Sequence, residues 1–427
     1  MKDIVPPPPA IVRNDVAAIK GLFEKNVVPT YARFEIALSH GAGSYVWDVT
    51  GKRYLDFGGG IAVSSLGHAH PAITEALVEQ SKKLVHTSNL YYHESQGRLA
   101  EKLVKYIGPG KVFFSNSGGE ANEGLFKLAR KFGHDEGRFE IITALNSFHG
   151  RTLACISATG QDKVKKGFEP MVPGFRHVPY NDLEAIKNAI SPATVAVMIE
   201  CVQGEGGITS ASPEYLLGLR KLCDEKKMLL LLDSVQDGHF RTGRCQAFQR
   251  ILENVPGAEN FLPDGISMAK SLGAGFPIGA FWVNDRHSAL LSAGSHGSTY
   301  GGGPLACAVG LKVFEVIERE NLANHVRETG EFIKGGLLKL AEKYPQVVKT
   351  ARGLGFIMGL ELAPGIPAFA GSDKPQAVQF VIRLHEAGML SVPSGTQVVR
   401  LLPPYILNQK EAEEALQIIE SVVAKLV

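Results

Sequence analysis

Short apolar segments recur through the middle of the chain, and helical or turn-rich stretches separate them. The segments are KVFFS, EIITAL, TVAVMIE, MLLLLD and GAFWV. Their length suits β-strands, and continuous apolar runs are typical of strands that are buried on both faces of a parallel sheet. Because strands that alternate with helices build a sheet covered on both sides, the sequence predicts an α/β fold with a mainly parallel sheet.

The two ends of the chain follow a different pattern. Residues 322–344 and 410–427 have long amphipathic helical periodicity and surround shorter strands such as GFIMGLEL. A chain of 427 residues is long enough for two hydrophobic cores. We therefore expect a large domain over residues 71–315, a C-terminal small domain over 316–427, and an N-terminal segment over 1–70 that contributes to the small domain. Pro6 to Pro9 predict a stiff, disordered lead-in.

Charge and cysteine content argue against several classes of function. The formal net charge is +2, and no stripe of lysine and arginine interleaved with aromatic residues is present, so neither nucleic acid nor a membrane is an expected partner. The five cysteines are odd in number and lack CxxC spacing, which predicts neither a disulfide framework nor a metal site. With no long apolar run and no signal-peptide pattern, the sequence predicts a soluble cytoplasmic protein.

Polar residues follow the predicted strands at positions where ligands bind. Asp233 ends the leucine run, Gln236 follows it, and Lys270 precedes a glycine-rich loop. In open α/β sheets, ligands lie at the carboxyl ends of the strands. Taken alone, Asp233 is more simply explained as the cap of the next turn, and Lys270 as a solvated loop residue.

Further candidates follow the other strands. Gly118 and Gly119 open a helical pattern, where free backbone N–H groups can bind phosphate, although in isolation a plain tight turn is the simpler explanation. Phe148 follows EIITAL and could be a core residue, and Glu205 lies in the loop VQGEGG and could be solvated. Together, a phosphate cradle, an aromatic face, an aspartate and a lysine are what pyridoxal 5′-phosphate (PLP) requires. In that interpretation, Asp233 faces the protonated ring nitrogen.

Several longer motifs resemble those of the class III aminotransferases. They are GKRYLDFGGGIAVSSLGHAHP, NSGGEANE, SFHGRTLACISATGQ, IECVQGEGG, DSVQ, AKSLGAGFPIGA and HGSTYGGGPLACAVG. The resemblance runs from about Tyr31 to the C-terminus, and within the class it is greatest to the acetylornithine aminotransferases. It implies fold type I of the PLP-dependent transferases, with a smaller α+β domain built from both chain ends.

The resemblance also implies roles for individual residues. Lys270 matches the lysine that binds the cofactor covalently, Asp233 the partner of the ring nitrogen, and Arg400 the arginine that binds a substrate α-carboxylate. Arg151 matches the ligand of the distal carboxylate, and Glu205 the switch carboxylate that pairs with Arg400 when no α-carboxylate is present. The other cofactor-binding positions implied are Gly118, Gly119, Phe148, Val235, Gln236 and Thr299, and Ser298 and Tyr31 are added as substrate-binding candidates.

The implied reaction is transamination of N-acetyl-L-ornithine with 2-oxoglutarate. A 4-aminobutyrate, ornithine or other ω-amino acid aminotransferase is the alternative among enzymes, and a non-catalytic PLP-binding protein is a remote one. In this family Thr299 reaches the cofactor phosphate of the partner subunit, so the resemblance implies a homodimer.

Four positions depart from the family pattern. Ser234 replaces the usual glutamate after the ring-nitrogen aspartate, Ser64 and Gly303 replace asparagines, and Asp237 adds a carboxylate. We expect Asp237 to supply the negative charge that Ser234 lacks and to form an ion pair with Arg241.

Overall fold

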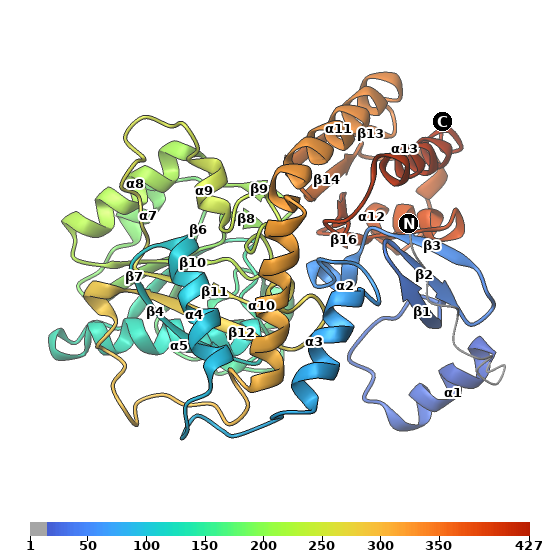
Figure 1. The fold of residues 1–427 in the computed structure, drawn as a ribbon. Coiled ribbons are helices and arrows are strands. Elements are labelled where there is room, and N and C mark those ends of the chain that lie inside the picture. Colours follow the sequence, from blue (N-terminus) through green and yellow to red (C-terminus); the bar gives the residue numbers. More distant parts are fainter. Residues whose placement is uncertain (1–14) are drawn as a thin grey trace.

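A seven-stranded sheet forms the centre of the larger part of the molecule (Figure 1). The computed structural model describes residues 15–427, so Pro6 to Pro9 lie outside the described residues. The strand order is β4-β12-β11-β10-β7-β5-β6. The strands are β4 (Gly110–Ser115), β5 (Glu140–Ala144), β6 (Phe175–Val178), β7 (Thr194–Ile199), β10 (Leu229–Asp233), β11 (Gly265–Met268) and β12 (Gly279–Asn284). Within this sheet β12 runs antiparallel to both neighbours and the other strands are parallel, which confirms the expected α/β class.

The leucine run of β10 is buried on both faces of this sheet. Leu229 and Leu231 belong to a core that includes residues of α5 (Gly118–Phe132) and α6 (Leu153–Ala158). Leu230 and Leu232 belong to the opposite core, which includes residues of α4 (Glu94–Ile107) and α8 (Pro213–Glu225). Because successive side chains of a strand point to opposite faces, an unbroken apolar run is what a doubly covered strand requires.

Asp264, which directly precedes β11, connects this strand to β10 and to α8. Its N–H donates to the Leu230 carbonyl at 2.8 Å, and its Oδ2 accepts from the Leu230 N–H at 2.8 Å. The guanidinium of Arg220 in α8 donates to the same carboxylate at 2.8 Å. The buried charge is therefore paired and hydrogen-bonded, as a carboxylate inside a protein must be.

Strands from both chain ends build two further sheets. The first combines β1 (Leu38–Ala42), β2 (Tyr45–Asp48) and β3 (Arg53–Asp56) with β15 (Met389–Leu390), which is parallel to β3. The second consists of β13 (Val348–Leu354), β14 (Ile357–Leu362), β17 (Val398–Leu401) and β16 (Val392–Ser394). The expected domain boundaries stay a prediction, and the boundary at 315/316 falls inside α10 (Pro304–Arg319).

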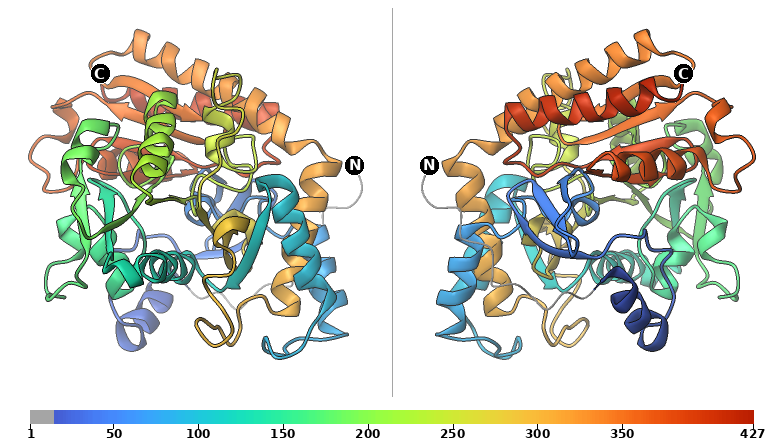
Figure 2. Two further views of the ribbon diagram at one scale, coloured as in Figure 1. Left: turned by 90° about the vertical axis from the view of Figure 1, so that its left-hand side faces the viewer. Right: turned by 90° about the vertical axis from the view of Figure 1, so that its right-hand side faces the viewer.

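The remaining helices cover these sheets and connect the two parts. Figure 2 shows α11 (Leu322–Lys343) beside α13 (Gln409–Ala424) along the C-terminal sheet. The other elements are α1 (Val16–Asn26), α2 (Gly59–Ala62), α3 (Pro71–Ser81), α7 (Leu183–Ala189), α9 (Ala247–Ile251), α12 (Gln376–Glu386) and the pair β8 (Val202–Gln203) and β9 (Thr209–Ser210). Within residues 15–427, no helix has the length and apolarity needed to span a membrane.

Candidate active site

The carboxyl ends of the parallel strands meet at one edge of the sheet and surround a cavity of about 350 Å³. Seven residues predicted from the sequence line it, namely Gly118, Gly119, Phe148, Asp233, Val235, Gln236 and Lys270. They arrive from four separate segments of the chain. Their convergence places an aspartate, a lysine, an aromatic ring and a helix N-terminus around one small volume.

The N-terminus of α5 forms one wall of the cavity. The Ser117 hydroxyl caps the helix by accepting the Glu120 N–H at 3.2 Å, which leaves the earlier N–H groups of the first turn without intrahelical acceptors. A Cβ on Gly118 would lie 2.7 Å from a methyl of Val235, so only glycine permits this close approach. Free N–H groups and the helix dipole make this turn suitable for a phosphate.

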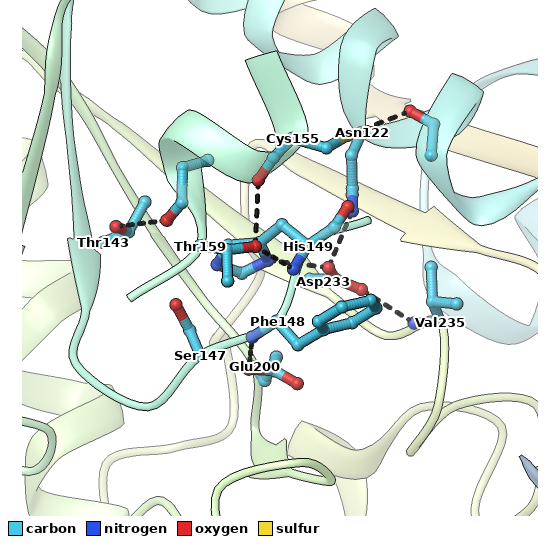
Figure 3. Close-up of polar contacts among 12 residues, drawn as sticks. Asn122, Thr143, Ser147, Phe148, His149, Cys155, Thr159, Glu200, Asp233 and Val235 are labelled. Carbon is cyan, nitrogen blue, oxygen red and sulfur yellow. Dashed lines mark hydrogen bonds and ion pairs between the residues drawn. The ribbon is translucent and has the colours of Figure 1, made fainter. Parts of the chain in front are cut away.

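Asp233 lies at the centre of a buried hydrogen-bond network (Figure 3). Its Oδ2 accepts from His149 Nδ1 and from Asn122 Nδ2, each at 2.8 Å, and its Oδ1 accepts the Val235 N–H at 3.0 Å. One oxygen therefore caps the turn after β10, and the other is held by side chains from other elements.

The network keeps Asp233 ionised. Burial acts to raise the pKa of this carboxyl, but hydrogen bonding and charge from His149, together with the Val235 and Asn122 donors, outweigh burial and lower the pKa below its usual value. Asp233 thus presents a fixed negative charge at the cavity.

Lys270 follows β11 and begins a short 3₁₀ helix, Lys270–Gly273. Its φ of +45° lies in the left-handed region, which costs a non-glycine residue of the order of 1–2 kcal/mol and is a form of strain found at functional sites. Burial and then the charge of Arg400 lower the pKa of its amine to about 8, against the opposing effects of nearby carboxylates. A substantial fraction of the amine is therefore neutral in mildly alkaline solution and able to accept a proton.

A second charged group lies beside the cavity, where β17 presents Arg400. Its Nη1 donates to Glu205 Oε1 and to Gln236 Oε1, each at 2.6 Å. Arg400 is buried, and although burial acts to raise the pKa of Glu205, the charge and hydrogen bonds of Arg400 lower it. The ion pair that the resemblance implied between the two residues is present. Gln236 also lines the cavity, so its amide connects Arg400 to the cavity wall.

Glu200 is a cavity residue that sequence reasoning missed. Its Oε2 accepts the Phe148 N–H at 3.1 Å, and it lines the cavity with Asp233. Burial and then the charge of Asp233 raise the pKa of Glu200 well above its usual value, which favours the protonated form of this carboxyl. A signal existed, because Glu200 ends the run TVAVMIE in the way that Asp233 ends the leucine run.

Six predicted residues are not part of the cavity lining within the described chain, namely Arg400 and Glu205, which lie beside it, and Arg151, Ser298, Thr299 and Tyr31. The guanidinium of Arg151 lies 5.5 Å from the centre of the Phe148 ring. Ser298 is one step removed from the cavity, because its Oγ accepts from Asn116 Nδ2 at 3.2 Å and Asn116 is a lining residue. Thr299 is exposed, and Tyr31 is 74% exposed.

The expected ion pair between Asp237 and Arg241 is wrong. Asp237 is buried, and its Oδ2 accepts the Val202 N–H at 2.7 Å. Arg241 points elsewhere, donating to backbone carbonyls of Ala62, Phe356 and Pro403, and its guanidinium lies 4.7 Å from the centre of the Tyr405 ring. Backbone oxygens and an aromatic face thus satisfy the arginine, and within residues 15–427 no carboxylate pairs with it.

Comparisons with known proteins agree with this geometry. The sequence model of the family "Aminotransferase class-III" matches residues 27–423. The acetylornithine aminotransferase of Gloeobacter violaceus is 45% identical over 411 residues, covering 96% of this chain and 98% of the relative. The succinylornithine transaminase/acetylornithine aminotransferase of Pseudomonas aeruginosa is 42% identical, covering 95% of this chain and 97% of its own.

Solved structures give the same picture. The ornithine aminotransferase from Toxoplasma gondii ME49 is similar with a TM-score of 0.88 at 30% identity, covering 96% of this chain and 95% of that one. The acetylornithine aminotransferase from Elizabethkingia anophelis is similar with a TM-score of 0.82 at 30% identity, covering 96% and 99%.

Proposed function

Because the chain belongs to the class-III aminotransferases, which are PLP-dependent enzymes, we propose that it transfers the amino group of N-acetyl-L-ornithine to 2-oxoglutarate. The products are N-acetyl-L-glutamate 5-semialdehyde and L-glutamate, a step of arginine biosynthesis. The observation that carries this proposal is the ion pair between Arg400 and Glu205 beside the cavity. The names of the relatives that are 41–45% identical support the same substrate.

The cavity suits the cofactor. The glycine turn at the start of α5 would hold the phosphate, Phe148 and Val235 would enclose the ring, and Asp233 would hold the proton of the ring nitrogen. Gln236 would contact the ring hydroxyl, and Lys270 would hold the cofactor covalently. When bound, PLP carries the amino group from one substrate to the other.

Lys270 is the proposed proton carrier. Its lowered pKa leaves the amine able to accept a proton from the carbon that bears the donor's amino group, and to return one in the second half-reaction. The fixed charge of Asp233 would make that carbon more acidic by keeping the ring nitrogen of the bound cofactor protonated.

Glu205 and Arg400 fit a pair of dissimilar substrates. N-acetylornithine reacts at an amine that has no carboxylate beside it, and an unpaired arginine would then be costly in a closed site. Glu205 neutralises Arg400 in that half. In the other half, the α-carboxylate of 2-oxoglutarate would displace Glu205, while Arg151 would hold the distal carboxylate of either substrate in a bidentate contact.

A homodimer belongs to the same proposal. Thr299 is exposed in a loop outside the cavity lining, which fits a role toward the phosphate of the partner subunit. Light scattering should give twice the chain mass of 46.0 kDa. We also propose a cytoplasmic location, since all five cysteines are buried free thiols, as is usual in reducing compartments.

A panel of ω-amino donors tests the substrate, with 2-oxoglutarate as acceptor and glutamate formation as the readout. N-acetylornithine should give the highest kcat/KM. A higher value for ornithine would favour the alternative supported by the fold similarity to ornithine aminotransferases. A cofactor absorbance that N-acetylornithine leaves unchanged would favour a non-catalytic PLP-binding protein.

A further inference from the structure

A second cavity, of about 540 Å³, lies away from the active site. It is bounded by the loop that follows Phe240 and by the junction between α10 and α11, with Tyr106 of α4 on a third side. Its volume falls within the range of roughly 300–1,000 Å³ that is usual for small-molecule sites. The mechanism proposed above uses none of its lining residues.

Guanidinium groups dominate the charge at one end of this cavity. Arg244 and Arg327 both line it, and both contact the carboxylate of Glu253, Arg327 at 3.2 Å. Arg250 contacts the same carboxylate at 2.9 Å. Three guanidiniums thus share one carboxylate, which leaves an excess of two positive charges.

The one acidic residue among the described lining residues is already neutralised. Glu318 accepts from the Tyr106 hydroxyl at 2.7 Å and from Lys102 Nζ at 2.9 Å. The charge of Glu318 is therefore balanced by Lys102 and does not offset the positive charge of the arginines.

Packing and a hydrogen bond hold Arg327 in place at the cavity. A Cβ on Gly243 would lie 2.2 Å from Arg327 Cγ, so the stem of Arg327 packs directly against this glycine. Its Nη2 donates to Asn324 Oδ1 at 3.0 Å. Arg327 and Arg244 remain partly exposed, at 29% and 47% of their side chains, so their forks are accessible to a ligand.

Apolar and polar groups complete the opposite side. Phe240, Ile317 and Ala323 provide apolar surface, and the Tyr106 ring lies beside Phe240 at 5.2 Å between ring centres.

We propose that this cavity is a second ligand site that binds a small dicarboxylate, with its two carboxylates at the arginines and its methylene chain against the apolar wall. Arginine forks match carboxylate geometry, and a dianion balances the excess charge.

Calorimetric titration of the holoenzyme with glutarate, an unreactive five-carbon dicarboxylate, tests the proposal. Two sites per chain are expected, because the active site also binds such a diacid. Arg400→Gln should remove one site and leave the other. Arg244→Gln and Arg327→Gln should each weaken glutarate binding at the second cavity about tenfold or more, without changing the transamination rate. Glu253→Gln should increase the affinity of the second cavity for glutarate several-fold, because this substitution removes the carboxylate that the guanidinium groups share.

Arg98→Gln is the matched control, because this exposed arginine pairs with glutamates on α4 outside the cavity lining. It should leave both sites unchanged, and thermal unfolding should show that every variant is folded. A single site in the wild type, or a second site that survives the double variant Arg244→Gln/Arg327→Gln, overturns the proposal. Equal binding of inorganic phosphate at the second site would refute a dicarboxylate as its ligand.

Discussion

The Arg400 guanidinium lies 2.6 Å from the Glu205 carboxylate, and the same nitrogen lies 2.6 Å from the side-chain oxygen of Gln236. One arginine is thereby connected to a carboxylate that can leave and to an amide that lines the cavity. A substrate carboxylate that displaces Glu205 would therefore arrive at a position already oriented toward the reacting centre.

The two half-reactions should respond differently to Arg400→Lys. The half with 2-oxoglutarate should lose about thirty- to a thousand-fold in kcat/KM, because a bidentate contact worth roughly 2–4 kcal/mol is lost. The half with N-acetylornithine should stay nearly unchanged. Arg151→Lys is the comparison, and it should slow both halves. Single-turnover kinetics measure each half separately, and equal losses for Arg400→Lys would contradict the switch.

Lys270→Ala should lower turnover by several orders of magnitude, because the covalent contact and the proton carrier are both removed. Cofactor should still bind through the glycine turn and the ring contacts. The measurement is a turnover assay together with equilibrium dialysis of PLP. Lys165→Ala, which removes a lysine outside the cavity lining, serves as the control. Turnover near the wild-type rate in Lys270→Ala would disprove the site assignment.

His149→Ala should change the pH profile. The hydrogen bond and charge of His149 lower the pKa of Asp233, so their removal raises it and allows the carboxylate to protonate at higher pH. The acidic side of the kcat/KM profile should shift to higher pH, so that kcat/KM at pH 6 falls about tenfold relative to its value at pH 8. Thr159→Val tests whether packing alone is responsible, because Thr159 contacts only the His149 backbone within this network. A profile with unchanged shape would show that His149 does not control Asp233.

Asp237→Asn should stabilise the protein, and more so as the pH rises. Burial raises the pKa of Asp237 to about 7, above the usual 3.8, so the folded state disfavours its charged form. The resulting loss of unfolding free energy is absent below about pH 4, where the carboxyl is protonated in both states, and reaches its full value above about pH 7. Asparagine has no ionisable group and so causes no such loss. The gain in unfolding free energy should therefore grow by about 2–3 kcal/mol between pH 5 and pH 8. Urea unfolding measures it, with the exposed Asp135→Asn as control. A gain independent of pH would mean that the pKa of Asp237 is the same in the folded and the unfolded protein.

The sequence was sufficient to predict the cavity residues that follow strands. The predicted strands other than GAFWV, which forms the antiparallel β12, end at the same edge of the sheet, so Asp233 and Phe148 had to converge once the parallel sheet was inferred. The short strands β6 and β11 were not among the predicted apolar runs, although β11 carries the segment that precedes Lys270.

Contacts between distant segments were beyond the reach of sequence patterns. Asn122 and Asp233 are 111 positions apart, and neither residue type nor spacing indicates their hydrogen bond. The ion pair expected for Arg241 failed for the same reason, since the backbone carbonyls that it binds belong to remote loops. A buried arginine can be satisfied by oxygens that every residue carries, and such partners leave no trace in a sequence.

Four successive identical side chains in β10 also affect how this strand finds its place during folding. If the strand slid by one or two residues, leucine would still replace leucine on each face, so packing alone discriminates poorly between the alternatives. Residues other than the four leucines must therefore distinguish the native alignment from the shifted ones. Asp264 accepts the N–H of one particular leucine, Leu230, and Asp233 meets His149 only in the native alignment. The carboxylates of Asp264 and Asp233 thus distinguish the native alignment of β10 from its shifted alternatives. The aspartate that we propose as the partner of the cofactor ring therefore also selects the correct pairing of the strand.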